Sequence, residues 1–163
     1  MVSIIEVTDK AQLRRFVDYP NELYKDVPQF VPATYGDDLS DWDRSKNPAF
    51  EYCDARCWLA MRDGEIVGRI GAIHSRKAND KWGANRLRFT QVDFIDDPEV
   101  SSALFRTVES WAKELDCTAV HGPLGFTDMA ARVCWWRALT AAAAFSHTTT
   151  IPTTSTTWPP WAM

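Results

Sequence analysis

ARCWLAMRDGEIVGRIGAIH, residues 55–74, decides the fold of this chain. Apolar residues dominate its first half, and isoleucine and valine recur in its second half. Between the halves stands Asp63-Gly64, a pair that accepts the positive φ angles of a tight type I′ turn. β-Branched residues suit a pleated, half-buried surface, so the stretch predicts two antiparallel strands. Because two strands are not stable alone, we expect a larger sheet and covering helices around this hairpin.

The composition excludes several classes of protein. A length of 163 residues predicts one domain with a sizeable core. The net charge of −4 argues against a nucleic-acid binder that relies on phosphate contacts. The start MVSIIEVTDK has neither a basic segment nor a long apolar segment, so it predicts no signal peptide. No run approaches the ~18 apolar residues of a membrane span, and we expect a cytoplasmic protein.

The polar clusters do not predict a metal site. Cys53 and Cys57 could join His74 as partial zinc ligands, but the chain has no C-x-x-C pair, and buried thiols are the simpler interpretation. Four aspartates between residues 37 and 43 match no calcium loop and are more typical of a solvated helix face or an ordered loop. We therefore expect no bound metal.

The N-terminal half predicts short elements around the hairpin. Residues 3–7 are β-prone, and Thr8 or Asp9 can cap a following helix. Tyr19-Pro20 should end or kink that helix, with another short helix over residues 21–26. The polar residues 75–86 are typical of a loop.

The second half predicts a strand, a helix and a strand. Residues 88–95 alternate, which would place Phe89 and Asp93 on the same face of a strand. Asp97 is a good N-cap, and Pro98 suits the first position of the following helix. Apolar residues then recur every three or four positions up to Leu115, so they form one continuous helix face. Residues 118–121 predict the next strand, and Gly122-Pro123 ends it.

The chain changes character after about Met129. Residues 130–163 hold no Lys, Asp or Glu but four tryptophans and an alanine run. A low-complexity tail is one interpretation, although such tails rarely contain tryptophan. The genetic code offers another, because a displaced reading frame decodes residues 132–139 as G-M-L-V-E-G-F. We expect residues 1–129 to be the native domain, followed by a frameshifted tail that packs poorly and is mostly irregular or one short helix.

Four segments together resemble a group of bacterial GNAT-like proteins, which have the acyl-CoA N-acyltransferase fold. They are FVDYPNELYKDVPQFVP (16–32), NPAFEY (47–52), WLAMRDGEIVGRIGAIHS (58–75) and HGPLGFTDM (121–129). The resemblance covers residues 2–129, and its distant members include ceramide-synthase-like acyltransferases. It implies a mixed α/β sheet with helices on both faces, here incomplete at the C-terminus because the relatives are longer.

The resemblance also implies an acyl-CoA site. In GNAT enzymes the fourth strand splays from the fifth, and its backbone, here Val92, Asp93 and Phe94, pairs with the pantetheine arm of acetyl-CoA or a longer acyl-CoA. The next helix start holds the pyrophosphate through a glycine-rich loop. This chain departs there, because F-I-D-D-P-E-V-S-S (94–102) has no glycine and adds carboxylates that would repel a pyrophosphate.

The chemistry implied is acyl transfer to an amine, which needs a base and hydrogen-bond donors for the thioester oxygen. Candidate bases are Glu65, His74, Asp93 and His121, each of which also has a structural interpretation. Asp93 could instead pair with Arg69 or Arg88, and Arg69 needs a carboxylate if it is buried. The amine substrate and self-association stay open. The alternative is a non-catalytic GNAT-like half-domain that packs against a missing second domain.

Overall fold

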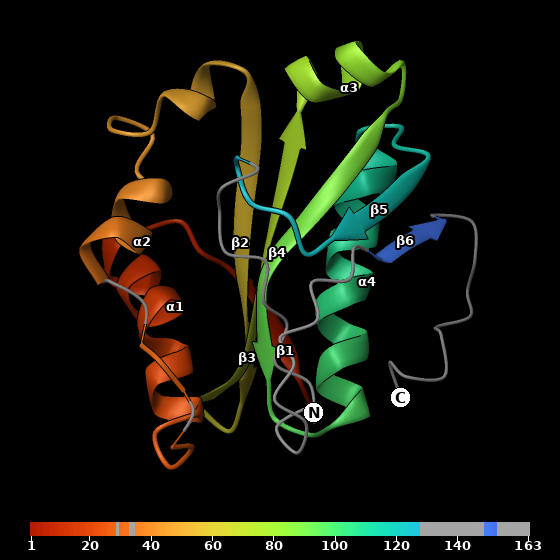
Figure 1. The fold of residues 1–163 in the computed structure, drawn as a ribbon. Coiled ribbons are helices and arrows are strands. Elements are labelled where there is room, and N and C mark those ends of the chain that lie inside the picture. The colour runs from red at the N-terminus through yellow and green to blue at the C-terminus, as the bar shows by residue number, and fades with distance from the viewer. Residues whose placement is uncertain (29, 33–34, 128–148, 153–163) are drawn as a thin grey trace.

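The computed structural model describes residues 1–28, 30–32, 35–127 and 149–152. These residues form one mixed α/β sheet with helices on both faces (Figure 1). In chain order the elements are β1 (Ser3–Glu6), α1 (Lys10–Leu23), α2 (Tyr35–Asp41), the 3-10 helix η1 (Pro48–Glu51), β2 (Cys53–Arg62), β3 (Glu65–Ser75), α3 (Arg76–Trp82), β4 (Arg86–Phe94), α4 (Pro98–Glu114), β5 (Ala119–Gly122) and β6 (Thr149–Pro152).

The predicted hairpin is the centre of the sheet. Strands follow the order β1-β2-β3-β4-β5-β6, and every neighbouring pair is antiparallel except the parallel pair β4–β5. Asp63 and Gly64 both have positive φ, 51° and 87°, as the Asp-Gly turn between β2 and β3 requires. The hairpin prediction is therefore confirmed.

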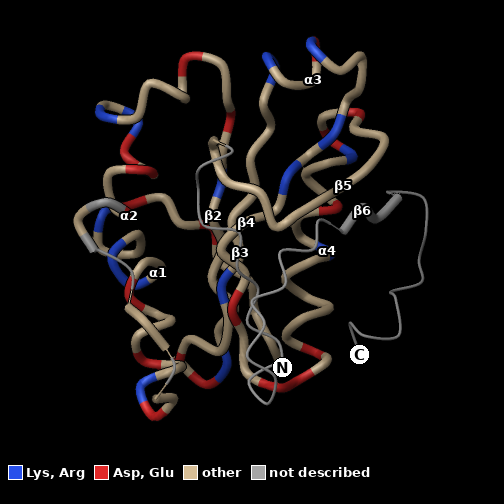
Figure 2. Tube along the Cα trace, in the orientation of Figure 1, with Lys and Arg blue, Asp and Glu red and all other residues tan. Residues whose placement is uncertain are grey.

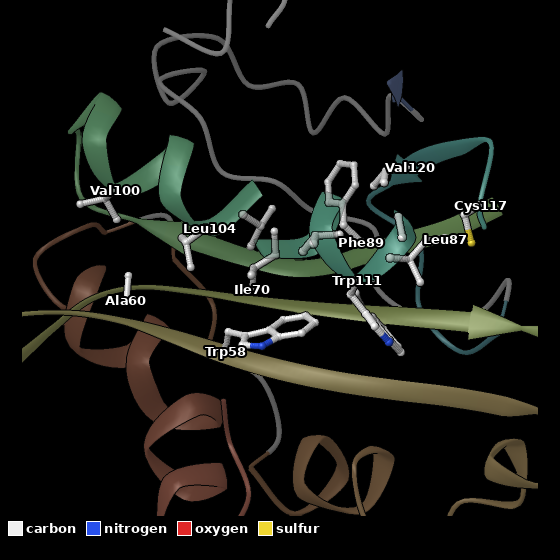
Figure 3. Packing of buried hydrophobic residues seen from close by; sticks show 14 of the residues in the cluster. Trp58, Ala60, Ile70, Leu87, Phe89, Val100, Leu104, Trp111, Cys117 and Val120 are labelled. Atoms are coloured by element: carbon white, nitrogen blue, oxygen red, sulfur yellow. The ribbon is translucent and has the colours of Figure 1, made fainter. Parts of the chain in front are cut away.

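The two faces of the sheet carry different layers. α4 covers one face, while α1 and α2 lie on the other (Figure 1). Under α4, Trp58 meets Trp111 edge to face with ring centroids 5.8 Å apart, and Ile70 and Leu104 are fully buried nearby (Figure 3). Asp97 caps α4 and Pro98 opens it, so the sequence prediction for this helix is confirmed.

The prediction that the helix ends at Tyr19-Pro20 is wrong, because α1 runs from Lys10 to Leu23 with Pro20 inside it. A proline inside a helix removes one N–H and leaves the carbonyl four residues earlier without its donor. Here that carbonyl belongs to Phe16, and the Arg69 Nη1 donates to it at 2.7 Å. A side chain from β3 therefore supplies the hydrogen bond that Pro20 cannot.

The predicted loop over residues 75–86 is also wrong, because most of it forms α3. Ser75 caps this helix by accepting from the Ala78 N–H, and Gly83 ends it in the left-handed conformation. None of the helix residues is buried. The segment therefore lacks the apolar periodicity by which a helix is recognised in a sequence.

The predicted alternation along residues 88–95 fails in the middle of β4. Gln91 has a positive φ of 44°, and the register against β3 shifts between Arg69 and Gly71. Such a bulge adds one residue and reverses the alternation beyond it. Phe89 consequently packs in the core under α4, whereas Asp93 pairs with Arg69 beneath α1, so the two residues lie on opposite faces.

Most of the tail that was predicted to follow the native domain after about Met129 lies outside the described residues. Thr149–Pro152 are described, and they pair antiparallel with β5 as β6. This strand differs from the irregular structure that we predicted for these four residues. Threonine and isoleucine both favour extended backbone, which accounts for the difference. Within the described ranges, no helix has the length and apolar character needed to cross a membrane.

Candidate active site at the open edge of β4

The strands β4 and β5 pair over only part of their length. Their parallel register joins Arg86 to Ala119 and ends where Arg88 meets His121. β4 itself continues to Phe94. The Phe89 carbonyl accepts from the Leu124 N–H at 2.8 Å. Beyond Phe89, no described strand pairs with β4 on the side of β5. The chain after β5 turns away across the sheet (Figure 1).

The part of β4 beyond its pairing with β5 directs some of its backbone groups away from β3. The Ile95 N–H donates to the Val67 carbonyl of β3 at 3.0 Å. Consecutive residues of a strand direct their N–H and C=O to opposite sides. Phe94 and Val92 therefore direct theirs toward the side that β5 leaves. We call residues 92–94 the open edge of β4.

A side chain from beyond α2 holds the bulge that precedes this edge. The Trp42 indole Nε1 donates to the Gln91 Oε1 at 2.9 Å. The same indole lies on Gly71 of β3, where an added Cβ would come within 2.7 Å of the ring. Sequence reasoning did not assign this role to Trp42. The signal present was Gly71, since glycine in a strand marks a bulge or a close approach.

Asp93 lies beneath α1 in a buried polar network. Its Oδ2 is 2.8 Å from the Arg69 Nε, and both side chains are about 7% exposed. Its Oδ1 accepts from the Tyr24 hydroxyl at 3.0 Å. Arg69 also lies over the Phe16 ring, 5.0 Å from its centroid. The predicted carboxylate partner of Arg69 is thus Asp93, whose proton-accepting atoms are both already engaged.

His121 stands where β4 and β5 separate. Burial, followed by the positive charges of Arg88 and Arg86, lowers its pKa to about 4. The imidazole is therefore neutral at pH 7 and able to accept a proton, although a pKa this low makes it a weak base. His121 pairs with Arg88 at the last position of the β4–β5 register, next to the point where the two strands part.

Acidification should destabilise the fold through His121. Between pH 6.5 and about 4 the unfolded histidine binds a proton that the folded one does not, so the free energy of unfolding falls over this window. Because the ring is only half-buried, we expect a loss of roughly 1–2 kcal/mol. Urea unfolding at pH 7 and pH 4.5 measures it. His121→Asn should show a smaller pH dependence, and equal dependence in both proteins would contradict the assignment.

The other predicted bases lie elsewhere. His74 is at the end of β3 beside α3, where its Nε2 is 2.9 Å from the Asn85 Oδ1 and 3.1 Å from the Asn79 Nδ2. This cluster adjoins the paired start of β4 and not its open edge. Glu65 is exposed at the hairpin turn. In the described part of the chain, no group of three or more His, Cys, Asp and Glu residues could hold a metal ion.

Acidic residues gather at the start of α4, where a pyrophosphate was expected (Figure 2). The Asp97 carboxylate accepts from the Glu99 N–H at 2.8 Å. Arg62 Nη2 lies 2.8 Å from Asp97 and 2.9 Å from Glu99. Its hydrogen bond and the cap hold the pKa of Asp97 below its usual value. A helix N-terminus attracts anions, and at the start of α4 the carboxylates of Asp97 and Glu99 are already present.

The fold defined by this sheet is that of the acyl-CoA N-acyltransferases, the GNAT fold. A tandem GNAT protein from the clavulanic acid biosynthesis pathway superposes with a TM-score of 0.57 and 16% identity, over 74% of this chain and 36% of that protein. A GNAT-family acetyltransferase from Staphylococcus aureus Mu50 gives a TM-score of 0.54 and 16% identity, over 74% and 71%. The predicted fold class is confirmed.

Two curated proteins are similar in sequence. Protein YghO of Escherichia coli K12 is 32% identical over 115 residues, which are 71% of this chain and 29% of YghO. The bacterial ceramide synthase of Caulobacter vibrioides is 29% identical over 127 residues, 77% of this chain and 33% of the synthase. The chain thus spans about a third of the length of these distant homologues. No protein-family model matches it.

Proposed function

We propose that this chain is the acyl-CoA-binding part of a GNAT-type acyltransferase that transfers an acyl group to an amine. The open edge of β4 carries the proposal, because no described strand pairs with it there and Val92 directs its N–H and C=O groups to the side where β4 and β5 separate. An extended pantetheine arm has amide groups of its own, so it can hydrogen-bond such an edge as an added strand would. The relative named a ceramide synthase favours an amine acceptor, because a ceramide is an N-acylated amine.

The reaction has a simple balance. The amine nitrogen attacks the thioester carbonyl carbon, forming the C–N bond, and the C–S bond breaks as the amine loses a proton and the thiol gains one. Backbone N–H groups at the open edge are suited to stabilise the carbonyl oxygen as charge develops on it. His121 is the candidate to accept the proton, because it is neutral and lies where the strands part.

The start of α4 does not fit the pyrophosphate of CoA. The first amides already hold the Asp97 carboxylate, and Arg62 is engaged by Asp97 and Glu99. A phosphate placed there would meet two carboxylates at short range. The proposal therefore assigns binding energy to the pantetheine and acyl portions and none to this helix start.

Calorimetric titration of acetyl-CoA, a long-chain acyl-CoA and acetyl-pantetheine into the chain tests the proposal. We expect saturable binding of all three, with acetyl-pantetheine within a few-fold of acetyl-CoA, because the helix start adds nothing for the pyrophosphate. A folded protein that binds none of them would contradict the proposal. That result would favour a non-catalytic half-domain instead.

A further inference from the structure

A cleft of about 710 Å³ lies on the side of the sheet that carries α1 and α2. The two helices contact each other there (Figure 1), and the cleft is lined by both of them and by the start of β2. Of the described residues that line it, none belongs to the open edge of β4. Small-molecule sites have volumes of roughly 300–1,000 Å³, so the cleft is large enough for an organic ligand.

The inner surface of this cleft is largely apolar. Ala55 and Cys57 of β2 line it and are buried, 8% and 5% exposed. Leu13 of α1, Leu39 of α2 and Phe50 of η1 also line it, and they are only partly buried where they pack against the core cluster. Apolar surface that is enclosed by a cleft in this way favours a ligand with an apolar portion.

Basic side chains line the cleft from two separate segments. Lys10 and Arg14 are four residues apart on α1, so they lie on the same face of that helix. Arg44 and Lys46 come from the segment between α2 and η1. Like charges four residues apart destabilise a helix, and an anion bound between the two segments would offset this repulsion.

The carboxylates that line the cleft already have partners within the protein. Asp9 caps α1. Asp43 accepts hydrogen bonds from the Ser45 N–H and hydroxyl at 2.9 and 2.6 Å. Glu6 lies 3.9 Å from Arg56. Among the described residues, no carboxylate forms an ion pair with any of the four cations contributed by α1 and by the segment after α2.

We infer that this cleft binds a small organic carboxylate, with its anionic group among Lys10, Arg14 and Lys46 and its apolar portion beside Phe50. An arginine fork matches a carboxylate geometrically, and lysine adds a second charge. The carboxylate of Asp43 favours a singly charged ligand over a doubly charged phosphate, because it repels the second negative charge. The inference does not rest on the proposed function, since the cleft and the open edge share no residue.

Cinnamate, an aromatic carboxylate, and cinnamamide, its neutral amide, are matched probes of this cleft. In a titration of the 15N-labelled chain, cinnamate should shift the amides of Ala55 and Cys57 to saturation. The amide of Leu104 in α4, which belongs to the core cluster on the other face of the sheet, should stay in place. We expect cinnamamide to bind about 5-fold more weakly or worse, because it has no charge for the cations to attract.

The double variant Lys10→Gln with Lys46→Gln tests the contribution of the charges. We expect the dissociation constant for cinnamate to rise about 5–10-fold, the value of two partly exposed ion pairs, and that for cinnamamide to stay the same. Lys25→Gln with Lys81→Gln is the matched control, because it removes the same charge at two positions that do not line the cleft. It should leave both dissociation constants unchanged.

Three results would overturn the inference. The first is a titration in which cinnamate leaves the Ala55 and Cys57 amides unmoved. The second is equal affinity for cinnamate and cinnamamide, because the cations would then play no part. The third is an equal loss of cinnamate binding in the two double variants, which would show that net charge and not this cleft attracts the ligand. None of these results depends on whether the chain binds acyl-CoA.

Discussion

Arg69→Ala should lower the free energy of unfolding by ~3–5 kcal/mol, the largest single effect that we expect in this protein. The substitution leaves the Asp93 carboxylate, 6% exposed, without its cation. It also removes the donor to the Phe16 carbonyl, which Pro20 cannot replace. The buried carboxylate then keeps only the Tyr24 hydroxyl and the Phe16 carbonyl loses its donor, and each change alone is costly. Urea unfolding followed by tryptophan fluorescence measures the change.

The matched variants separate charge from hydrogen bonding. Arg69→Lys keeps a positive charge but lacks the fork that reaches both Asp93 and Phe16, so it should recover only part of the loss. The double variant Arg69→Met with Asp93→Leu removes both charges, and we expect it to be more stable than Arg69→Ala. An Arg69→Ala protein within 1 kcal/mol of wild type would contradict a buried ion pair of this kind.

Gly122→Ala should destabilise the fold by roughly 3 kcal/mol, the upper end of the range for overpacking. Gly122 ends β5 where it parts from β4, and an added Cβ would overlap the Phe89 carbonyl oxygen and lie 2.8 Å from the Phe89 ring. A flexible side chain could move aside, but a backbone carbonyl of the central strand cannot. The Phe89 carbonyl also holds the Leu124 N–H, so the strain falls on the last contact between the two strands.

Gly36→Ala is the control for this substitution. Gly36 lies inside α2, and nothing stands within 4 Å of its added Cβ. Alanine is favoured over glycine inside a helix by about 0.5–1 kcal/mol, so this variant should be slightly more stable than wild type. Equal thermal midpoints for Gly122→Ala and Gly36→Ala would show that β4 and β5 do not approach each other as described.

The sheet was predictable because its signals are local. The Asp63-Gly64 turn and the apolar runs beside it define β2 and β3, and Asp97 with Pro98 marks the start of α4. Two elements failed for opposite reasons. α3 buries nothing and so shows no periodicity, while α1 passes through Pro20 because Arg69, 49 residues later in the chain, satisfies the freed carbonyl. Neither feature can be recognised from the local sequence of the helix concerned.

Of the candidate site, only the backbone segment of β4 could be predicted from the sequence. The family resemblance directed attention to Val92, Asp93 and Phe94, and these residues lie in the part of β4 beyond its pairing with β5. Their binding role stays a prediction. The bulge at Gln91 and the indole of Trp42 that holds it depend on contacts between distant elements. A bulge in particular reverses side-chain direction without any change in composition, so the alternation pattern assigned Asp93 to the wrong face.

Amide chemical shifts of the 15N-labelled chain during titration with acetyl-CoA would test the central claim most directly. If the open edge of β4 holds the pantetheine arm, the Val92 and Phe94 amides shift and saturate together. The amides of Trp58 and Leu59, which pair within the sheet in the middle of β2, should stay in place. Saturable binding that shifts other amides and leaves Val92 and Phe94 unchanged would contradict the account.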